Sequence, residues 1–228
     1  PYVYMSDDYG QTWKSISSNI PTSSVNVIKE DSENENVLYL GTDNGLYVSF
    51  DYGASWEAFS KNLPNVAVHD LVIQPTAKHL IIGTHGRSLY KANIGAIQEF
   101  TKGIKKHNKI EIFTINSIRK RGSWGSSWSK WLDANTPELN IPFYANDTKK
   151  VTVDIFSDDT KVNSFSIDAD KGFNEAIFDV SFSKKGLKAY KKANKDTDIK
   201  KAKNDVYYLP KGKYTIKIGD EKGEFEVK

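Results

Sequence analysis

The hydrophobic pattern of the first hundred residues is typical of short β-strands separated by polar turns. Apolar and polar side chains alternate with a period of two, which places successive residues on opposite faces of a strand. Residues 2–6 and 12–16 flank a polar, Gly-containing turn and predict a hairpin. The same alternation predicts four strands of one antiparallel sheet and three of the next, at residues 25–30, 37–42, 46–50, 55–59, 68–73, 80–84 and 88–92.

A repeat of 43 residues underlies this pattern. Residues 3–13 read VYMSDDYGQTW and residues 46–56 read LYVSFDYGASW, and the two segments align without a gap. The matched polar and aromatic positions are Ser6 with Ser49, Asp8 with Asp51, Gly10 with Gly53, Thr12 with Ser55, and Trp13 with Trp56. A period of about 40 to 45 residues built from short strands indicates a propeller-like array.

Each of these repeated positions has a structural duty available to it. An Asp carboxylate can accept backbone N–H groups of its own turn, Gly tolerates a positive φ, and Trp can pack over the hairpin. We therefore expect the ten matched residues to hold turns and not to contact a ligand.

The motif Ser-x-Asp-x-Gly-x-Thr/Ser-Trp, with the runs GTDNGLYVS and GTHGRSLY, resembles the Asp-box, or BNR repeat, of sialidase-like and sortilin-like β-propellers. The chain looks like the sortilin-like bacterial proteins of this group that carry a "glycosyl hydrolase" label. The resemblance implies four-stranded blades, a place outside the cell, in the periplasm or on the cell surface, and recognition of a protein or peptide. Because a propeller typically has 4 to 8 blades and residues 1–103 supply about two, we expect the remaining blades from a longer polypeptide or from another chain.

The resemblance also raises the question of catalysis. Sialidases of this group clamp a substrate carboxylate with three Arg, whereas only Arg87 of the three Arg in this chain lies in the repeats. Asp43 and Asp70 are candidates for the carboxylate pair of an inverting glycosidase, although a turn and a strand start are the ordinary places for Asp. No catalytic residue is assigned, so the chain is interpreted as a non-catalytic interaction module. The alternative is the C-terminal part of a sialidase-like or endoglucanase-like hydrolase, whose catalytic residues lie mostly outside this chain.

Ligand-binding candidates lie where the predicted strands end, because loops on a rigid scaffold often carry function. They are Asp43, His69, Asp70, His85 and Arg87. For Arg87, the favoured interpretation is that it links neighbouring blades by hydrogen bonds. Four His without a spaced cluster of His and carboxylates support no metal site, and no motif indicates a cofactor.

Residues 104–136 are predicted to connect two domains. The segment 119–132 reads RKRGSWGSSWSKWL and contains Trp124, Trp128 and Trp131. Aromatic rings in a Gly/Ser-rich segment can stack on a sugar or fill an interface between domains. Both interpretations stay open, so a glycan remains a possible partner.

Residues 137–228 have the pattern of a small all-β domain. Seven short strands are predicted, at residues 139–144, 151–157, 162–167, 176–181, 206–209, 214–218 and 223–227. Their number and spacing suit an immunoglobulin-like sandwich. The runs VTVDIFSDD, KVNSFSIDADKGFNEAIFDV and YYLPKGKYTIKIG are similar to the Ig-like domain of the flagellar hook-cap type. The fold class is therefore all-β: a partial β-propeller followed by an Ig-like β-sandwich.

Charge and composition narrow the function further. A Lys-rich insert at residues 184–205 has nine Lys and three Asp, a local balance of +6 in a chain of net charge +3. It predicts a short amphipathic helix, which is either a solvated surface element or an electrostatic contact for an acidic partner or polysaccharide. Because the basic charge is confined to this insert, no nucleic-acid-binding face is indicated. The chain has no Cys and no apolar run long enough to span a membrane.

Overall fold

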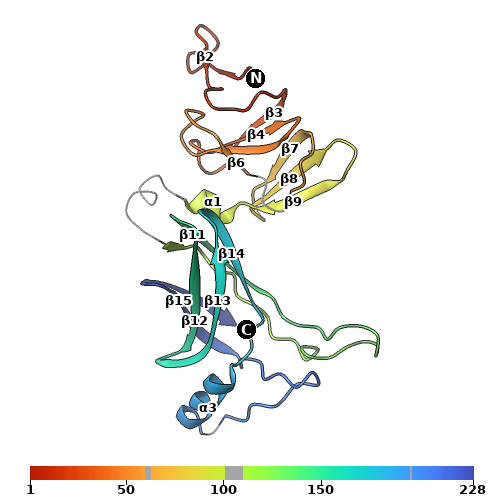
Figure 1. The fold of residues 1–228 in the computed structure, drawn as a ribbon, viewed down its shortest axis with the longest axis vertical. Helices are drawn as coiled ribbons and strands as arrows, with labels where there is room; N and C mark the ends of the chain where they lie inside the picture. Colours follow the sequence, from red (N-terminus) through yellow and green to blue (C-terminus); the bar gives the residue numbers. More distant parts are fainter. Residues whose placement is uncertain (60–62, 101–109, 196) are drawn as a thin grey trace. The chain divides into compact units, whose positions relative to one another are not determined.

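The computed structural model describes residues 1–59, 63–100, 110–195 and 197–228. Two compact units divide the chain, residues 1–102 and residues 103–228 (Figure 1). Both are built from antiparallel strands, and the predicted all-β fold class, a partial propeller followed by a β-sandwich, is confirmed. The immunoglobulin-like character of the second unit stays a prediction.

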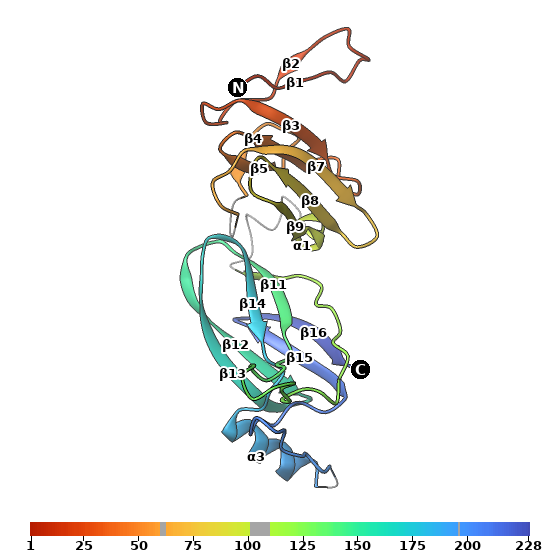
Figure 2. The ribbon, with the colours of Figure 1, turned by 90° about the vertical axis from the view of Figure 1, so that its right-hand side faces the viewer.

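The first unit contains three antiparallel sheets that follow one another along the chain. The strand orders are β1-β2, β3-β4-β5-β6 and β7-β8-β9. Their bounds are β1 Tyr4–Met5, β2 Lys14–Ser15, β3 Val25–Glu30, β4 Leu38–Thr42, β5 Gly45–Ser49, β6 Glu57–Ala58, β7 Val68–Gln74, β8 His79–Thr84 and β9 Leu89–Asn93. Figure 2 shows the second and third sheets side by side, as the neighbouring blades of a propeller are.

An apolar cluster joins the first hairpin to the second sheet. Val3, Ile16 and Ile20 of the hairpin region are buried with Leu40 and Trp56 of the next repeat. Burial of such side chains supplies about 1.5 to 3 kcal/mol each, so the cluster stabilises the contact between the two repeats.

Hydrogen bonds fix the register of this junction. The Trp56 indole Nε1–H donates to the carbonyl of Ile16 at 2.7 Å. The Asn19 side chain receives the Trp56 backbone N–H and donates to the Trp56 carbonyl, both at 2.8 Å. Gly53 leaves room for Ile16, since a Cβ on Gly53 would lie 2.8 Å from the Ile16 Cδ1 atom. Gly53 and Trp56 of the second motif copy therefore fix the position of Ile16 and Asn19, which follow the first copy.

The second and third sheets approach through Gly41 of β4. A Cβ on this residue would lie 2.6 Å from Val27 Cγ1 and 2.7 Å from Val68 Cγ1. Any larger residue would separate β4 from β7. The glycine of the run GTDNGLYVS is thus explained by close packing of one sheet on the next.

A short helix, α1 (Gly95–Glu99), follows β9 and was not predicted. Its Gln98 amide donates to both carboxylate oxygens of Asp31, at 3.1 and 3.2 Å. The Tyr39 hydroxyl donates to the same buried carboxylate at 3.1 Å. Asp31 also accepts the backbone N–H groups of Glu33 and Asn34. This buried carboxylate is fully paired, and it fastens α1 to the second sheet.

The second unit is a sandwich of two antiparallel sheets around one core. The sheets have the orders β10-β11-β14 and β13-β12-β15-β16. Their bounds are β10 Ile110–Ile112, β11 Leu139–Ala145, β12 Lys149–Ser157, β13 Thr160–Ala169, β14 Gly172–Phe178, β15 Gly212–Ile218 and β16 Glu221–Val227. The inward positions of these strands form the core, in which Ile141, Phe143, Ile155 and Ile216 are fully buried.

Of two predictions for this unit, the structure agrees with one and contradicts the other. The predicted helix in the Lys-rich insert exists as α3 (Lys184–Ala193), with the Ser183 hydroxyl accepting the Gly186 N–H as an N-cap. The strand predicted at residues 206–209 is wrong, because this stretch makes only an isolated bridge between Tyr208 and Ser181.

The junction between the first two repeats gives a prediction. Trp56→Phe in the full chain removes the indole N–H and leaves the buried Ile16 carbonyl without this donor. The free energy of unfolding should therefore fall by about 1 to 3 kcal/mol. Trp13→Phe is the matched control, because Trp13 is 64% exposed where Trp56 is 4% exposed. Denaturant unfolding of both variants checks this, and an equal effect of the two would contradict the role given to Trp56.

Candidate functional site

The two repeated turns have the same hydrogen-bond set. In the first, the Asp8 carboxylate accepts the Thr12 N–H at 2.8 Å and the Thr12 hydroxyl at 2.6 Å, and Ser6 Oγ accepts the Gly10 N–H at 2.7 Å. In the second turn, Asp51 receives the Ser55 N–H and hydroxyl at the same two distances, and Ser49 Oγ accepts the Gly53 N–H at 2.9 Å. Each carboxylate thus accepts both the N–H and the hydroxyl of the residue four positions later in its own turn.

The backbone of the turns explains the glycines. Gly10 and Gly53 have φ values of 86° and 82°, and each follows a Tyr with φ of 59°. Two successive residues with positive φ favour Gly at one of them. Gly10, Gly53 and the Asp carboxylates thus shape the turns, and their lack of contact with a ligand stays a prediction.

A β-bulge occurs at the same place in the second and third sheets. The pairing of β3 with β4 skips a residue between Val25 and Val27, and that of β7 with β8 skips one between Val68 and Asp70. The bulged residues are Asn26 and His69, which lie 43 residues apart. Bulges re-aim side chains and are frequent beside functional sites.

Each bulged side chain contacts a residue of the next turn but one, which follows β4 in the second sheet and β8 in the third. The Asn26 amide donates to Asp43 Oδ1 at 2.9 Å. The His69 ring lies over the His85 ring, with 5.3 Å between the centroids. The backbone repeats as well, because Asp43 N–H donates to the Ser24 carbonyl and His85 N–H donates to that of Ala67. Asn26–Asp43 and His69–His85 are therefore equivalent pairs in consecutive blades.

The two pairs are connected across the blades. Besides binding Asp43, the Asn26 amide donates to the Val68 carbonyl of β7 at 3.2 Å. Hydrogen bonds from Asn26 and Ser24, with a smaller charge interaction with His69, lower the pKa of Asp43 below its ordinary value of 3.8. Asp43, His69 and His85 are exposed. The result is a solvent-facing polar cluster, formed by Ser24, Asn26, Asp43, His69 and His85, that we call the blade-end cluster.

The remaining candidates from the repeats lie beside this cluster in the chain. Asp70 follows the His69 bulge and accepts the Leu71 N–H at 2.9 Å, which is the ordinary role of Asp at a bend. Arg87 is exposed in the turn between β8 and β9, where the Thr84 hydroxyl accepts the Ser88 N–H. The sequence pointed to Asp43, His69 and His85 but missed Ser24 and Asn26.

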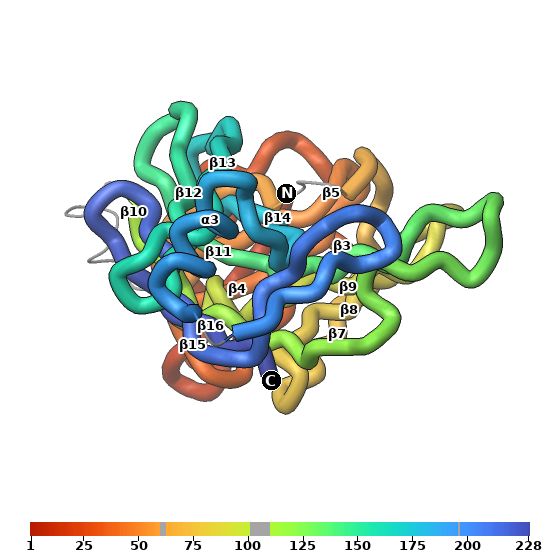
Figure 3. Tube along the Cα trace, turned by 90° about the horizontal axis from the view of Figure 1, so that it is seen from below, coloured from red at the N-terminus to blue at the C-terminus, as the bar shows by residue number. Residues whose placement is uncertain are grey.

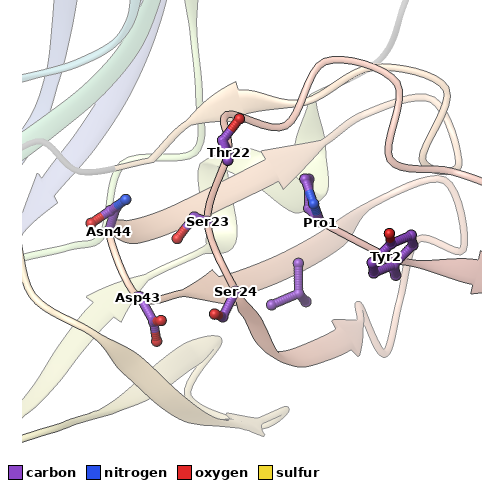
Figure 4. Close-up of a pocket in the computed structure, with 8 residues that line it drawn as sticks. Pro1, Tyr2, Thr22, Ser23, Ser24, Asp43 and Asn44 are labelled. Atoms are coloured by element: carbon purple, nitrogen blue, oxygen red, sulfur yellow. The ribbon is translucent and has the colours of Figure 1, made fainter.

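A cleft of about 690 Å³ adjoins Asp43. Figure 4 shows Ser23, Ser24, Asp43 and Asn44 on one side and Pro1 and Tyr2 on the other. The Ser23 hydroxyl is buried and has no hydrogen-bond partner among the residues that the structure describes. The cleft thus offers the ionised carboxylate of Asp43 to a ligand.

The three Trp of residues 119–132 lie in different environments. Trp124 is buried in the core of the second unit, edge-on to the Tyr208 ring at 5.6 Å. Trp128 and Trp131 are 98% and 93% exposed. Only the last two are available to a partner, and packing between domains stays a prediction for them.

The described ranges contain neither a metal-binding group of side chains nor a membrane-spanning helix. No three His, Asp or Glu side chains there are grouped so as to hold a metal ion. None of the helices in the same part of the chain combines the length and the apolar character needed to cross a bilayer.

Comparison with known proteins supports the repeat analysis. Residues 2–110, just under half of the chain, match the Sortilin-Vps10 family model, described as "Sortilin, neurotensin receptor 3", which is a β-propeller family. The first part of the chain is part of a β-propeller. No curated protein matches the sequence.

Solved structures share only a distant similarity with the chain. The extracellular domain of a hybrid two-component system from B. thetaiotaomicron is 11% identical, with a TM-score of 0.34 over 98% of this chain, which spans 28% of that protein. The AfRom2 CNH domain is 12% identical, with a TM-score of 0.27 over 90% of this chain and 68% of the domain. Drosophila Semaphorin 2a is 12% identical, with a TM-score of 0.25 over 95% of this chain and 37% of that protein. These scores are too low to base an inference on.

The hydrogen bonds of the first repeated turn predict at which pH Asp8 loses its charge. Hydrogen bonds, above all from the Thr12 hydroxyl, lower the pKa of Asp8 from 3.8 to about 2. The pKa of Asp8 is lower in the folded than in the unfolded chain. Its carboxylate therefore contributes fully to folding stability above the unfolded pKa, and this contribution is lost as the pH falls through about 2. NMR titration of the Asp8 carboxyl carbon should show this midpoint, and Thr12→Val should raise it. Ser15→Ala, in the same hairpin, should leave it unchanged, and a wild-type midpoint near 3.8 would contradict the account.

Proposed function

We propose that the chain is a non-catalytic interaction module of a secreted or cell-envelope protein, and that its propeller binds a protein or peptide at the blade-end cluster. The observation that carries this proposal is the repeated bulge, which turns Asn26 and His69 toward Asp43 and His85 in consecutive blades. A rigid sheet end that displays polar side chains to solvent is a common form of binding surface.

The state of Asp43 argues against one catalytic role, that of the general acid of a glycosidase. A general acid of a glycosidase needs a raised pKa so that it keeps a proton near neutral pH. Asp43 has a lowered pKa, because Asn26 and Ser24 stabilise its charged form. A permanent carboxylate suits the cationic groups of a peptide, namely Lys, Arg or an N-terminus.

The surroundings of Asp43 add further recognition groups. Thr22, which is exposed and lines the adjoining cleft, can pair with a backbone group of an extended ligand. Arg87, exposed in the next blade's turn, can contact a carboxylate of the same ligand. The description of the matching family names a receptor, and this supports both ligand binding and a location outside the cytoplasm.

We further propose that additional blades cover both outer surfaces of the propeller segment. Trp13 is 64% exposed, whereas its equivalent Trp56 is buried by the preceding repeat. Leu89 of β9 is 74% exposed, whereas its equivalent Leu46 of β5 is 1% exposed. These two repeat positions are apolar in both copies, so their exposure supports partner blades of the same architecture, from the same polypeptide or from another chain.

A peptide-binding assay tests the proposed site. Three pools of synthetic peptides, basic, acidic and neutral, are titrated against the full chain. We expect the basic pool to bind best, and Asp43→Asn to raise its Kd about two- to fivefold, as is usual for an exposed ion pair. Asp7→Asn, an exposed Asp of the first turn, is the control and should leave the Kd unchanged.

Two outcomes of this assay contradict the proposal. Equal affinity of the Asp43→Asn and Asp7→Asn proteins for the basic pool would remove Asp43 from the site. Hydrolysis of a glycan panel by the wild-type protein, lost in Asp43→Asn, would replace a binding role by a catalytic one.

A further inference from the structure

The loop of residues 123–135 in the second unit presents three large apolar side chains to solvent. Trp128 and Trp131 are 98% and 93% exposed, and Leu132 is 60% exposed. The loop belongs to the green segment that projects from the second unit in Figure 3. Single exposed apolar residues are ordinary, but three within five positions make a patch that requires an explanation.

The base of this loop is held firmly. Gly125 N–H donates to the Asn135 carbonyl and Asn135 N–H to the Ser126 carbonyl, both at 2.8 Å. The Asn135 amide donates to Ser123 Oγ at 2.9 Å. Trp124 anchors the loop in the core, so the apolar tip is presented by a fixed base.

The hydroxyl groups of the tip are turned inward. Ser127 Oγ donates to the Leu132 carbonyl at 2.7 Å and accepts the Ser129 N–H at 3.3 Å. Ser129 Oγ accepts the Trp131 N–H, also at 3.3 Å. A sugar-binding platform needs polar groups that converge on the ligand beside the stacking ring. Here the Ser hydroxyls are used within the loop, which argues against a glycan and for an apolar or interfacial medium.

Cations accompany the apolar tip. Residues 119–135 contain four basic side chains and one acidic one, Asp133, a balance of 4 − 1 = +3, and Arg119, Arg121 and Lys130 are exposed. The Lys-rich insert lies at the base of the loop, because a Cβ on Gly125 would collide with Ala202 and Asn204. Exposed Trp at a membrane–water interface and Lys or Arg near anionic headgroups are the two elements of peripheral membrane binding.

We propose that this loop binds the surface of an anionic lipid bilayer. Trp128, Trp131 and Leu132 enter the headgroup region, and the surrounding cations contact lipid phosphates. This inference does not depend on the peptide site of the first unit. It gives the second unit a task of its own, which is to hold the propeller at a membrane surface without spanning it.

Vesicle co-sedimentation of the full chain tests the proposal. Vesicles contain either phosphatidylcholine alone or equal parts of phosphatidylcholine and phosphatidylglycerol. We expect binding to the anionic vesicles, a blue shift of Trp fluorescence, and weaker binding to the neutral ones. The double variant Trp128→Ser/Trp131→Ser should bind at least tenfold more weakly, with unchanged thermal unfolding, because both side chains are exposed.

Further variants separate the apolar from the charged contribution. Arg121→Gln/Lys130→Gln should reduce the preference for anionic vesicles by about fivefold or more, as expected for cations near a charged surface. Trp13→Ser, which removes an exposed Trp of the other unit, is the control and should bind as the wild type does.

Three results would overturn the proposal. The wild-type protein could fail to sediment with anionic vesicles, or the Trp128→Ser/Trp131→Ser protein could sediment as the wild type does. The third is Trp-dependent binding to soluble dextran or alginate in place of vesicles, which would make the loop a glycan platform.

Discussion

The structure of the first unit depends on the contact between one repeat and the next, in which the Trp56 indole donates to the Ile16 carbonyl. A propeller blade cannot bury both of its faces alone, so each blade needs a neighbour on either side. Trp56 meets this need with its ring in an apolar cluster and with three hydrogen bonds, one from the indole and two shared with Asn19. The Asp51 turn, in which the carboxylate accepts the Ser55 N–H and hydroxyl, places Trp56 for that contact.

This constraint locates the chemistry of the propeller segment. Because the Asp carboxylates of the repeated turns accept hydrogen bonds from their own turns, we expect them to shape these turns and not to bind a ligand. The opposite situation exists at the bulges, where the strand leaves its regular pairing and the side chains of Asn26 and His69 are directed to the turn residues. The same 43-residue spacing thus repeats two features with different purposes. One holds the array together, and the other provides a row of exposed polar groups along the blade ends.

Much of the fold was predictable from the sequence, since the alternation of Val25–Glu30 and its neighbours is that of strands and the matched turns fix the period. The site was predictable only in part. Asp43, His69 and His85 are residue types with visible chemistry, whereas Asn26 and Ser24 look like ordinary loop and strand residues. Bulges arise from backbone register, which no residue type signals, although aligning Asn26 with His69 at the known period would have revealed the pair. Residues 206–209 were predicted as a strand because VYYL is apolar and β-prone, but they bridge to Ser181 alone and extend no sheet.

The five Trp indoles allow the central contact to be measured directly, by hydrogen exchange of the indole N–H groups in an NMR spectrum of the full chain. Trp13, Trp128 and Trp131 are exposed, and their indole protons should exchange rapidly. The Trp56 indole is 4% exposed and bonded to Ile16, so its proton should exchange many times more slowly and only when the junction opens. Exchange of the Trp56 indole proton at the rate of the Trp13 indole proton would show that Trp56 does not hold the two repeats together, and would contradict the account.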